Sequence, residues 1–344
     1  MTISEAPLSL FAVIAAAILS AGITWAVRPL LSRYALARPN ARSSHRIPTP
    51  QGAGIAVIAA TLLVSGVIVA FADTAHLNIP VAIFVASLFI AAVGFADDVR
   101  SIPVLPRLLL QAIAVGAIIF TAPSDLRIVP SPPLWIERGL LLLAGLWFVN
   151  LVNFMDGLDW MTVVEVVPVT GAMVALAWLG QFPTSEAIVA AALCGAMLGF
   201  APYNRPVAKV FLGDVGSLPI GLLLAWCLLQ LAYHQQIAAA LLLPLYYLSD
   251  ATVTLLRRMV RREPFWAAHR THFYQRATDH GFTVWRVVSE VFVVNIGLAA
   301  LAILSTMTQS SVAKILLSVL GSIAVAFVLH RFSGQRWPCS SDSE

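Results

Sequence analysis

The chain has 344 residues, of which 59% are hydrophobic and only 11% are charged, with a formal net charge of +4. Soluble domains carry about 25% charged residues, so this composition excludes an ordinary soluble protein and indicates an integral membrane protein. Runs of Ala, Leu, Val and Ile approach the roughly 20 residues of a membrane helix and lack the alternation of barrel strands. The predicted fold is therefore all-α, a polytopic helical bundle with about 11 transmembrane helices.

The expected spans follow one another along the whole chain. In order, they are 8–27, 55–72, 79–95, 105–121, 135–152, 161–179, 187–202, 215–233, 237–256, 287–307 and 312–332. Lys and Arg favour the cytoplasmic side of a membrane. With the N-terminus outside, all of the 21 Lys and Arg residues except Arg127, Arg138 and Lys314 fall in cytoplasmic segments. The odd number of spans then places the C-terminus in the cytoplasm as well.

Four polar residues follow the fifth apolar run at regular intervals. Asn150, Asn153, Asp156 and Asp159 recur every third residue, so a continuous helix would place them on one face. Polar side chains at the end of a membrane helix are costly and usually functional. The alternative is a polar turn between two helices, because Asn and Asp-Gly are ordinary turn residues.

A pair of adjacent carboxylates, Asp97 and Asp98, follows the third apolar run. The run goes inward, so the pair meets the negative end of the helix dipole, which is unfavourable without a cation. Arg100 and Arg107 offer compensation, and so does a metal. Mg²⁺ prefers carboxylate, water and phosphate oxygens, which this face offers.

Two further cytoplasmic segments carry candidate groups. Asp214 lies between two glycines at the start of the eighth run, where backbone amides are free and approach is unhindered, although an N-capping Asp is the simple alternative. The loop that contains Arg42 and His45 ends in a Gly-rich turn, which suits an anionic ligand. A positively charged loop without any ligand is the alternative there.

The last long loop combines basic, aromatic and imidazole groups, including His269, Arg270 and His272. Such groups suit a nucleotide or a pyrophosphate. The alternative is an amphipathic helix on anionic lipid. Asp250, inside the ninth run, is expected only to neutralise the arginines that follow it.

Six stretches together resemble one family. They are PNARSSHRIPTPQGAG, FADDVRSIP, NLVNFMDGLDW, NRPVAKVFLGDVGS, LSDATVTLLRR and FWAAHRTHFYQR, in this order across residues 39–276. The chain resembles the polyprenyl-phosphate N-acetylaminosugar-1-phosphate transferases. The resemblance implies Mg²⁺-dependent transfer of a sugar 1-phosphate from a UDP-N-acetylaminosugar to polyprenyl (undecaprenyl) phosphate, with release of UMP; Mn²⁺ is an alternative metal.

The resemblance also assigns roles by matching positions. It implies Asp97, Asp98, Asp156 and Asp214 as catalytic residues, with Asp214, Asp97 and Asp98 on the metal. It implies a substrate-binding set of Asn153, Asn204, Lys209, His45, Arg42, His269, Arg270 and His272. It implies a single catalytic transmembrane domain over residues 1–332, with active-site loops at 28–54, 96–107, 153–160, 203–216 and 257–286 and a disordered cytoplasmic tail at 333–344.

Several positions depart from the family pattern. Gln51 stands where Arg is usual, and Trp160 stands where Gly is frequent. The segment from His269 to His272 lacks the consecutive histidines of the phospho-N-acetylmuramoyl-pentapeptide transferase branch. The chain therefore looks closer to the branch that initiates O-antigen or other surface polysaccharides.

The expected setting is the bacterial inner membrane, with an active site that faces the cytoplasm. Expected partners are the lipid carrier, the UDP-sugar, membrane lipids and a second copy in a homodimer, with no nucleic acid. The rival function is an ion-coupled secondary transporter. That function expects inverted repeats and acids near the bilayer midplane, whereas this sequence groups its acids on one predicted side.

Overall fold

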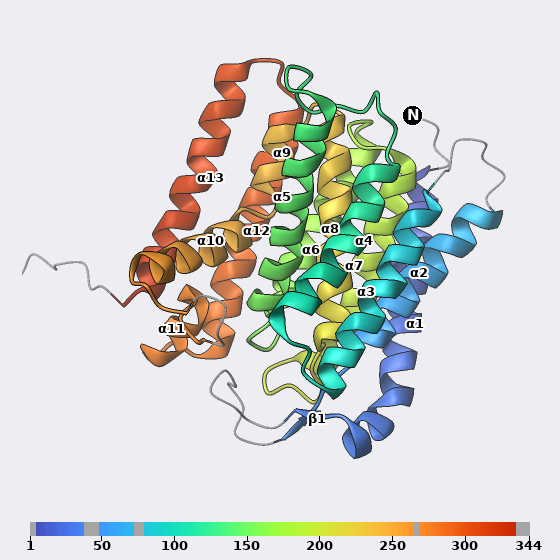
Figure 1. The fold of residues 1–344 in the computed structure, drawn as a ribbon, viewed down its shortest axis with the longest axis vertical. Coiled ribbons are helices and arrows are strands. Elements are labelled where there is room, and N and C mark those ends of the chain that lie inside the picture. The colour runs from blue at the N-terminus through green and yellow to red at the C-terminus, as the bar shows by residue number, and fades with distance from the viewer. Residues whose placement is uncertain (1–4, 38–47, 72–78, 265–268, 335–344) are drawn as a thin grey trace, which may run out of the picture.

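The computed structural model describes residues 5–37, 48–71, 79–264 and 269–334. Over these residues the chain forms one bundle of helices with a single two-stranded sheet (Figure 1). Ten of the described helices are long and apolar enough to cross a membrane. They are α1 (Glu5–Tyr34), α2 (Gly54–Phe71), α3 (Val81–Val99), α4 (Val104–Thr121), α5 (Leu134–Met155), α6 (Met161–Trp178), α7 (Thr184–Asn204), α8 (Asp214–Tyr233), α12 (Val284–Thr306) and α13 (Ser311–Phe332).

The centre of the bundle is formed by α6, α7 and α8, whose Val, Leu and Ala side chains are almost all buried. The outer helices α1, α4 and α13 expose most of their apolar side chains. This pattern is expected of a membrane protein, because lipid accepts apolar surface that water would not.

Helix α7 packs closely against α1 through two glycines. A Cβ atom on Gly195 would lie 2.0 Å from the carbonyl oxygen of Val13, and one on Gly199 would lie 2.2 Å from that of Ala17. Both distances are impossible for a real side chain. The four-residue spacing of these glycines therefore lets the two backbones touch, as small residues do between membrane helices.

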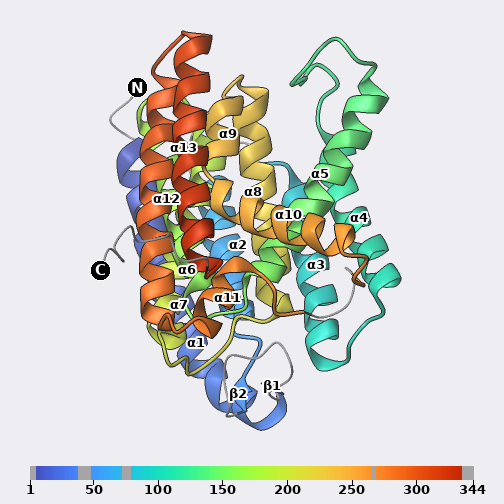
Figure 2. The same cartoon turned by 90° about the vertical axis from the view of Figure 1, so that its left-hand side faces the viewer.

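The helices alternate in direction, so α1, α3, α5 and α7 all end at one end of the bundle. The short strands β1 (Leu36–Ala37) and β2 (Thr49–Pro50) pair antiparallel there (Figure 2). We call this the strand end. One residue beyond β2, Gln51 forms a bridge with Phe211, which precedes α8.

The predicted ninth span, residues 237–256, is wrong as a single helix. The chain there forms α9 (Ile237–Leu242) and α10 (Leu245–Val260), and α10 runs across the bundle axis (Figures 1 and 2). Pro244 lies at the break and has no N–H to continue the helix. Helix α10 is also half polar: it packs Tyr246, Asp250 and Arg258 into the bundle, whereas Arg257 is exposed. The other ten predicted spans correspond to the ten helices named above.

After α10 the chain reaches the strand end, where the short helix α11 (Phe273–Asp279) lies beside the start of α12 and the end of α13. Arg276 Nη2 donates to the carbonyl oxygen of Ser333 at 3.1 Å, and His280 Nδ1 lies 3.1 Å from the carbonyl oxygen of Phe332. The last helix therefore fixes one side of α11. The predicted disordered tail falls almost wholly on residues 335–344, outside the described residues.

Candidate active site

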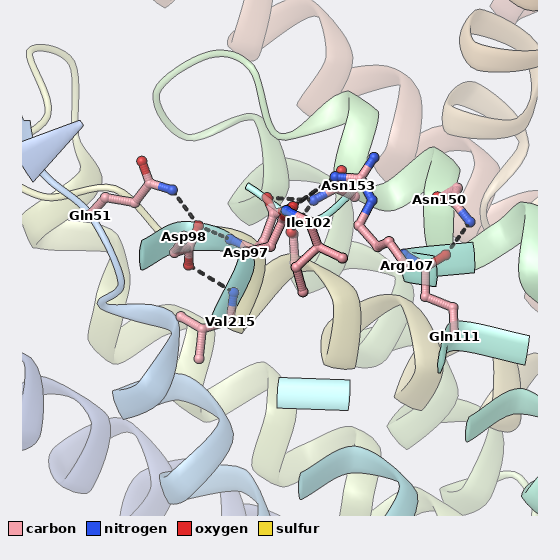
Figure 3. Close-up of polar contacts among 11 residues, drawn as sticks. Gln51, Asp97, Asp98, Ile102, Arg107, Gln111, Asn150, Asn153 and Val215 are labelled. Atoms are coloured by element: carbon pink, nitrogen blue, oxygen red, sulfur yellow. Dashed lines mark hydrogen bonds and ion pairs between the residues drawn. The ribbon is translucent and has the colours of Figure 1, made fainter. Parts of the chain in front are cut away.

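Helices α3 and α8 meet at the strand end at very short range. A Cβ atom on Gly94 of α3 would lie 2.3 Å from the carbonyl oxygen of Asp214, so only glycine permits this approach. The contact brings Asp98, at the last turn of α3, to the first turn of α8. The backbone N–H groups of Asp214 and Val215 donate to the two carboxylate oxygens of Asp98 at 2.9 and 3.0 Å (Figure 3). Asp98 thus satisfies the free amides at the start of α8.

Asp214 is not the N-cap of α8, so the capping alternative from the sequence is wrong. The N-cap residue of α8 is Gly213, and Asp214 is the first helical residue. The side chain that accepts the free amides belongs to Asp98, on another helix. The carboxylate of Asp214 is therefore available for other contacts.

Asp214 is joined to α5 through Asn153. The Nδ2 atom of Asn153 donates to Asp214 Oδ1 at 2.8 Å and to Ser217 Oγ at 2.9 Å. Because α5 ends two residues later, the site draws on the ends of α3 and α5 and the start of α8. The structure thus brings Asp97, Asp98, Asn153 and Asp214 together.

Arg107 on α4 lies between two of these carboxylates. Its Nη1 atom is 2.7 Å from Asp97 Oδ2 and 3.8 Å from Asp214 Oδ2. Asp97 also accepts the backbone N–H of Ile102 at 2.5 Å (Figure 3). The sequence suggested Arg107 only as charge compensation, and its place between Asp97 and Asp214 was not foreseen.

Gln51 completes the immediate surroundings of Asp98. Its Nε2 atom donates to Asp98 Oδ1 (Figure 3). The bridge to Phe211 holds the backbone of Gln51 beside the loop that leads into α8. A neutral amide therefore supports Asp98.

Of the two alternatives for the four polar residues, a continuous helix and a turn between two helices, the structure shows the turn. Helix α5 ends at Met155, and Asp156 is its C-cap residue. Trp160 then takes a left-handed conformation with φ of 64°, which turns the chain into α6. The four side chains consequently contact four different partners: Asn150 contacts Gln111, Asn153 contacts Asp214, Asp156 contacts Thr162, and Asp159 contacts the backbone N–H of Ala208.

Asp156 lies outside the membrane-spanning helices and is half-buried. Its removal from water raises the pKa of Asp156 to about 7, and the negative charges on Asp98 and Asp159 act in the same direction. The hydroxyl of Thr162, which donates to Asp156, opposes this rise in pKa. Asp156 therefore changes its charge near neutral pH.

A second group of predicted residues lies on the other side of the α5 terminus. The ring of His272 stacks on His269, with centroids 4.9 Å apart, and on Tyr274, with centroids 5.7 Å apart. Tyr274 Oη donates to the carbonyl oxygen of Phe154 at 3.0 Å. Since Phe154 follows Asn153 directly, the start of α11 is attached to the same end of α5 that contacts Asp214.

Three predicted substrate-binding residues have other surroundings. Asn204 accepts the backbone N–H of Trp160 at 2.8 Å and donates to the carbonyl oxygen of Val210 at 3.1 Å, so it holds the loop before α8. Lys209 is exposed on that loop. Arg270 pairs with Asp279 at 3.3 Å and so faces the end of α11. Two more, Arg42 and His45, lie outside the described residues.

The donor set suits a divalent ion held partly by substrate. Within the described residues, no group of three or more His, Cys, Asp and Glu side chains is arranged to hold a metal ion. Asp97 and Asp214 nevertheless place two carboxylates beside one guanidinium. Mg²⁺ commonly takes one or two carboxylates and completes its shell with water and phosphate oxygens. These residues therefore fit Mg²⁺ better than a metal that needs a complete protein cage.

The fold and the site define a polytopic helical membrane protein with a cluster of carboxylates and an arginine at the ends of its candidate membrane helices. The family profile described as "Glycosyl transferase family 4" matches residues 80–232, which contain Asp97, Asn153 and Asp214. The chain belongs to this family of polyprenyl-phosphate sugar-phosphate transferases.

The relatives fall into two groups by name. The phospho-N-acetylmuramoyl-pentapeptide-transferase of Streptococcus gordonii is 31% identical over 222 residues, covering 60% of this chain and 67% of the relative. That of Enterococcus faecalis is 26% identical and covers 78% of this chain and 91% of its own. The decaprenyl-phosphate N-acetylglucosaminephosphotransferase of Mycobacterium leprae is 28% identical over 327 residues, covering 85% of this chain and 82% of the relative.

Proposed function

We propose that this protein transfers an N-acetylaminosugar 1-phosphate from a UDP-sugar to polyprenyl phosphate in a bacterial inner membrane, and so starts a lipid-linked surface glycan. The observation that carries the proposal is the cluster of Asp97, Arg107, Asn153 and Asp214 at the strand end. A lipid phosphate and a soluble nucleotide can meet only where a membrane protein reaches water. The position of this cluster at the ends of candidate membrane helices supports such a meeting place.

The proposed reaction forms one bond and breaks one bond. An oxygen of the lipid phosphate attacks the sugar-bearing phosphorus of the donor, and the bond from that phosphorus to the bridging oxygen breaks. UMP leaves with the electron pair of the bridging oxygen. Both reactants are anions, so the protein must neutralise charge and align the groups more than it must supply covalent chemistry.

The residues of the cluster divide these tasks. The guanidinium of Arg107 supplies positive charge between Asp97 and Asp214. Asn153 holds the carboxylate of Asp214 through Oδ1, which leaves Oδ2 directed toward Arg107. Asp98 fixes the start of α8 and therefore the backbone of Asp214. The ordered cluster is thus prepared before substrates arrive.

Asp214 and Asp97 would hold Mg²⁺, which when bound supplies positive charge to the phosphate oxygens. The proposed active site faces the cytoplasm, where UDP-sugars are made. The segment from His269 to His272 has no consecutive histidines. We therefore assign the chain to surface-polysaccharide initiation rather than to peptidoglycan synthesis.

The test is release of UMP by purified protein in detergent or in membranes. UDP-N-acetylaminosugars are supplied one at a time, with and without undecaprenyl phosphate and with Mg²⁺ or EDTA. UMP release that requires both the lipid and the metal is the expected result. If no donor gives lipid-dependent release, the proposal fails and an ion-coupled transporter becomes the better function.

A further inference from the structure

Asp250 on α10 is fully buried and is the centre of a group of hydrogen bonds. Its two carboxylate oxygens accept from five donors. These are the Tyr246 hydroxyl and the Thr254 hydroxyl, each at 3.3 Å, the Nδ1 atom of His272 at 3.2 Å, and the backbone N–H groups of Phe273 and Tyr274 at 3.0 and 3.1 Å. A carboxylate offers about four lone-pair positions, so the acceptor capacity of Asp250 is filled.

These contacts differ from the expectation that Asp250 neutralises the arginines after it. Arg258 instead pairs with Glu263 at 2.9 Å, and the guanidinium of Arg257 lies 4.5 Å from the ring centre of Phe273. The contacts of Asp250 point toward α11. Asp250 accepts the first free amides of α11, just as Asp98 does for α8.

The same carboxylate determines which nitrogen of His272 is available. A carboxylate can only accept, so Nδ1 of His272 carries the proton that faces Asp250. Nε2 is then the nitrogen that remains for another ligand. The His272 ring is only 3% exposed and is held between His269 and Tyr274, so it cannot turn to exchange its two nitrogens.

His272 is also tied to the carboxylate cluster. Its ring centre lies 6.4 Å from that of Phe154, whose neighbour Asn153 contacts Asp214. Tyr274 donates to the backbone of the same Phe154. His272 and Asp214 therefore contact neighbouring residues at the end of α5.

We infer that Asp250 is a positioning residue for the proposed transfer: it holds His272 by Nδ1 so that Nε2 is presented to a phosphate oxygen of the nucleotide-sugar. The inference rests on the proposed function and adds to it a residue that acts through another. Asp250 itself touches no substrate. For histidines that bind metals, removal of the group that orients the ring costs about 10–100-fold, and a similar scale is expected here.

A double-mutant cycle tests this coupling. The variants are Asp250→Asn, His272→Asn and the double variant, and the readouts are KM for the donor, KM for the lipid, and kcat. We expect Asp250→Asn to raise the donor KM about tenfold and to leave the lipid KM unchanged. In the His272→Asn background, Asp250→Asn should add nothing, because the residue through which it acts has gone. Additive effects, or equal loss for both substrates, would overturn the inference.

Two control variants distinguish orientation of His272 by Asp250 from a general dependence of the fold on the hydrogen bonds of Asp250. Tyr246→Phe and Thr254→Val each remove one neutral donor to Asp250 and leave His272 in place. Both should keep the donor KM within about twofold, which is the scale of a single weak hydrogen bond. A tenfold rise in either control would show that any disturbance of Asp250 has the same result, and would overturn the inference.

A comparison within His272 does not depend on the folding of any Asp250 variant. The amide nitrogen of Asn lies where Nδ1 lies, whereas that of Gln reaches the place of Nε2. His272→Asn should therefore keep thermal stability and lose donor affinity. His272→Gln should lose stability and keep more of the donor affinity. The reverse order would contradict the assignment of the two nitrogens.

Binding of UDP, measured by calorimetry on the same variants, distinguishes this inference from the proposed function. If the effects of Asp250→Asn and His272→Asn on UDP affinity are not additive but the wild type never releases UMP, the proposed reaction is wrong and the positioning role stands. If the wild type turns over but the cycle is additive, the reaction stands and the positioning role is wrong. If UDP does not bind at all, the role of His272 is wrong as well.

Discussion

The carboxylate of Asp98 accepts the backbone N–H of Asp214 at 2.9 Å, and this bond separates the tasks of two acids that look alike in the sequence. Asp98 is occupied with the first turn of α8. The side chain of Asp214 is directed to Asn153 and Arg107. One acid therefore supports structure and the other faces the proposed chemistry.

Substitution of Asp214 by Asn should reduce turnover by about 100-fold or more, because an amide cannot replace the charge that the carboxylate brings to a metal and a phosphate. The Asn side chain can still accept from Asn153, so the yield of folded protein should stay near that of the wild type. Turnover at saturating Mg²⁺, with the extracted yield as control, is the measurement. Turnover like that of the wild type would remove Asp214 from the site.

Asp98→Ala should lower the stability of the folded protein more than Asp214→Asn does. It leaves two backbone N–H groups at the start of α8 without their partner, which costs about 1–3 kcal/mol of stability. Thermal unfolding in detergent should therefore begin at a lower temperature than in Asp214→Asn. Equal unfolding temperatures would mean that Asp98 does not support the helix.

Arg107→Gln removes the positive charge between Asp97 and Asp214. The two carboxylates then repel each other unless a cation replaces the guanidinium. Added Mg²⁺ should consequently raise the unfolding temperature of this variant more than that of the wild type, while turnover falls. Arg100→Gln is the matched control, since Arg100 is exposed, and it should respond to Mg²⁺ as the wild type does.

The pKa of Asp156, raised to about 7, predicts how stability depends on pH. In the unfolded chain the same carboxyl has a pKa of about 3.9. The folded state therefore binds the proton more tightly, and its contribution to stability is present below pH 4 and is lost as pH rises to about 7. Asp156→Asn should remove this component from a plot of unfolding temperature against pH. An unchanged plot would contradict the raised pKa.

Gly199→Val tests the contact between α1 and α7. The new side chain would meet the carbonyl oxygen of Ala17, so α1 must move away and the yield of extractable protein should fall. Gly171→Val is the matched control, because Gly171 of α6 is exposed and has nothing within 4 Å of its added Cβ. Equal yields of the two variants would show that the close approach is not needed.

The side of the membrane is tested with single cysteines at the exposed positions Thr271 and Gln309. The background carries Cys339→Ser, and the native Cys194 and Cys227 are buried. An impermeant thiol reagent should label the cysteine at 271 only in inverted membranes and the one at 309 only in intact cells. The opposite pattern would place the proposed active site outside the cell.

The sequence was sufficient for most of the fold, because apolar runs long enough to span a bilayer admit little else. It failed at Pro244, where an apolar composition concealed a break between α9 and α10. Hydropathy averages over a window and so does not register one missing N–H. The family resemblance also named Asp97 and Asp214, and the structure places both carboxylates near the guanidinium of Arg107.

What the sequence could not supply was the pairing of groups far apart in the chain. Asp98 and Val215 are 117 residues apart in the chain, and no local sequence pattern indicates that the Asp98 carboxylate accepts the backbone N–H of Val215. Arg107 gave a weak signal as a basic residue near two acids. The sequence around Asp250 was misleading, because its partners include the backbone N–H groups of Phe273 and Tyr274 and not the arginines nearest to it in the chain. Contacts of this kind depend on how helices pack, which is a property of the whole bundle.

The attachment of α11 to the end of α13 has a consequence for how the protein is made. Arg276 and His280 contact carbonyl oxygens of Ser333 and Phe332, near the last described residue. A ribosome makes those residues only after it has made α1 to α12. The segment that carries His272 thus lacks this support until α13 has been synthesised and has packed beside α11.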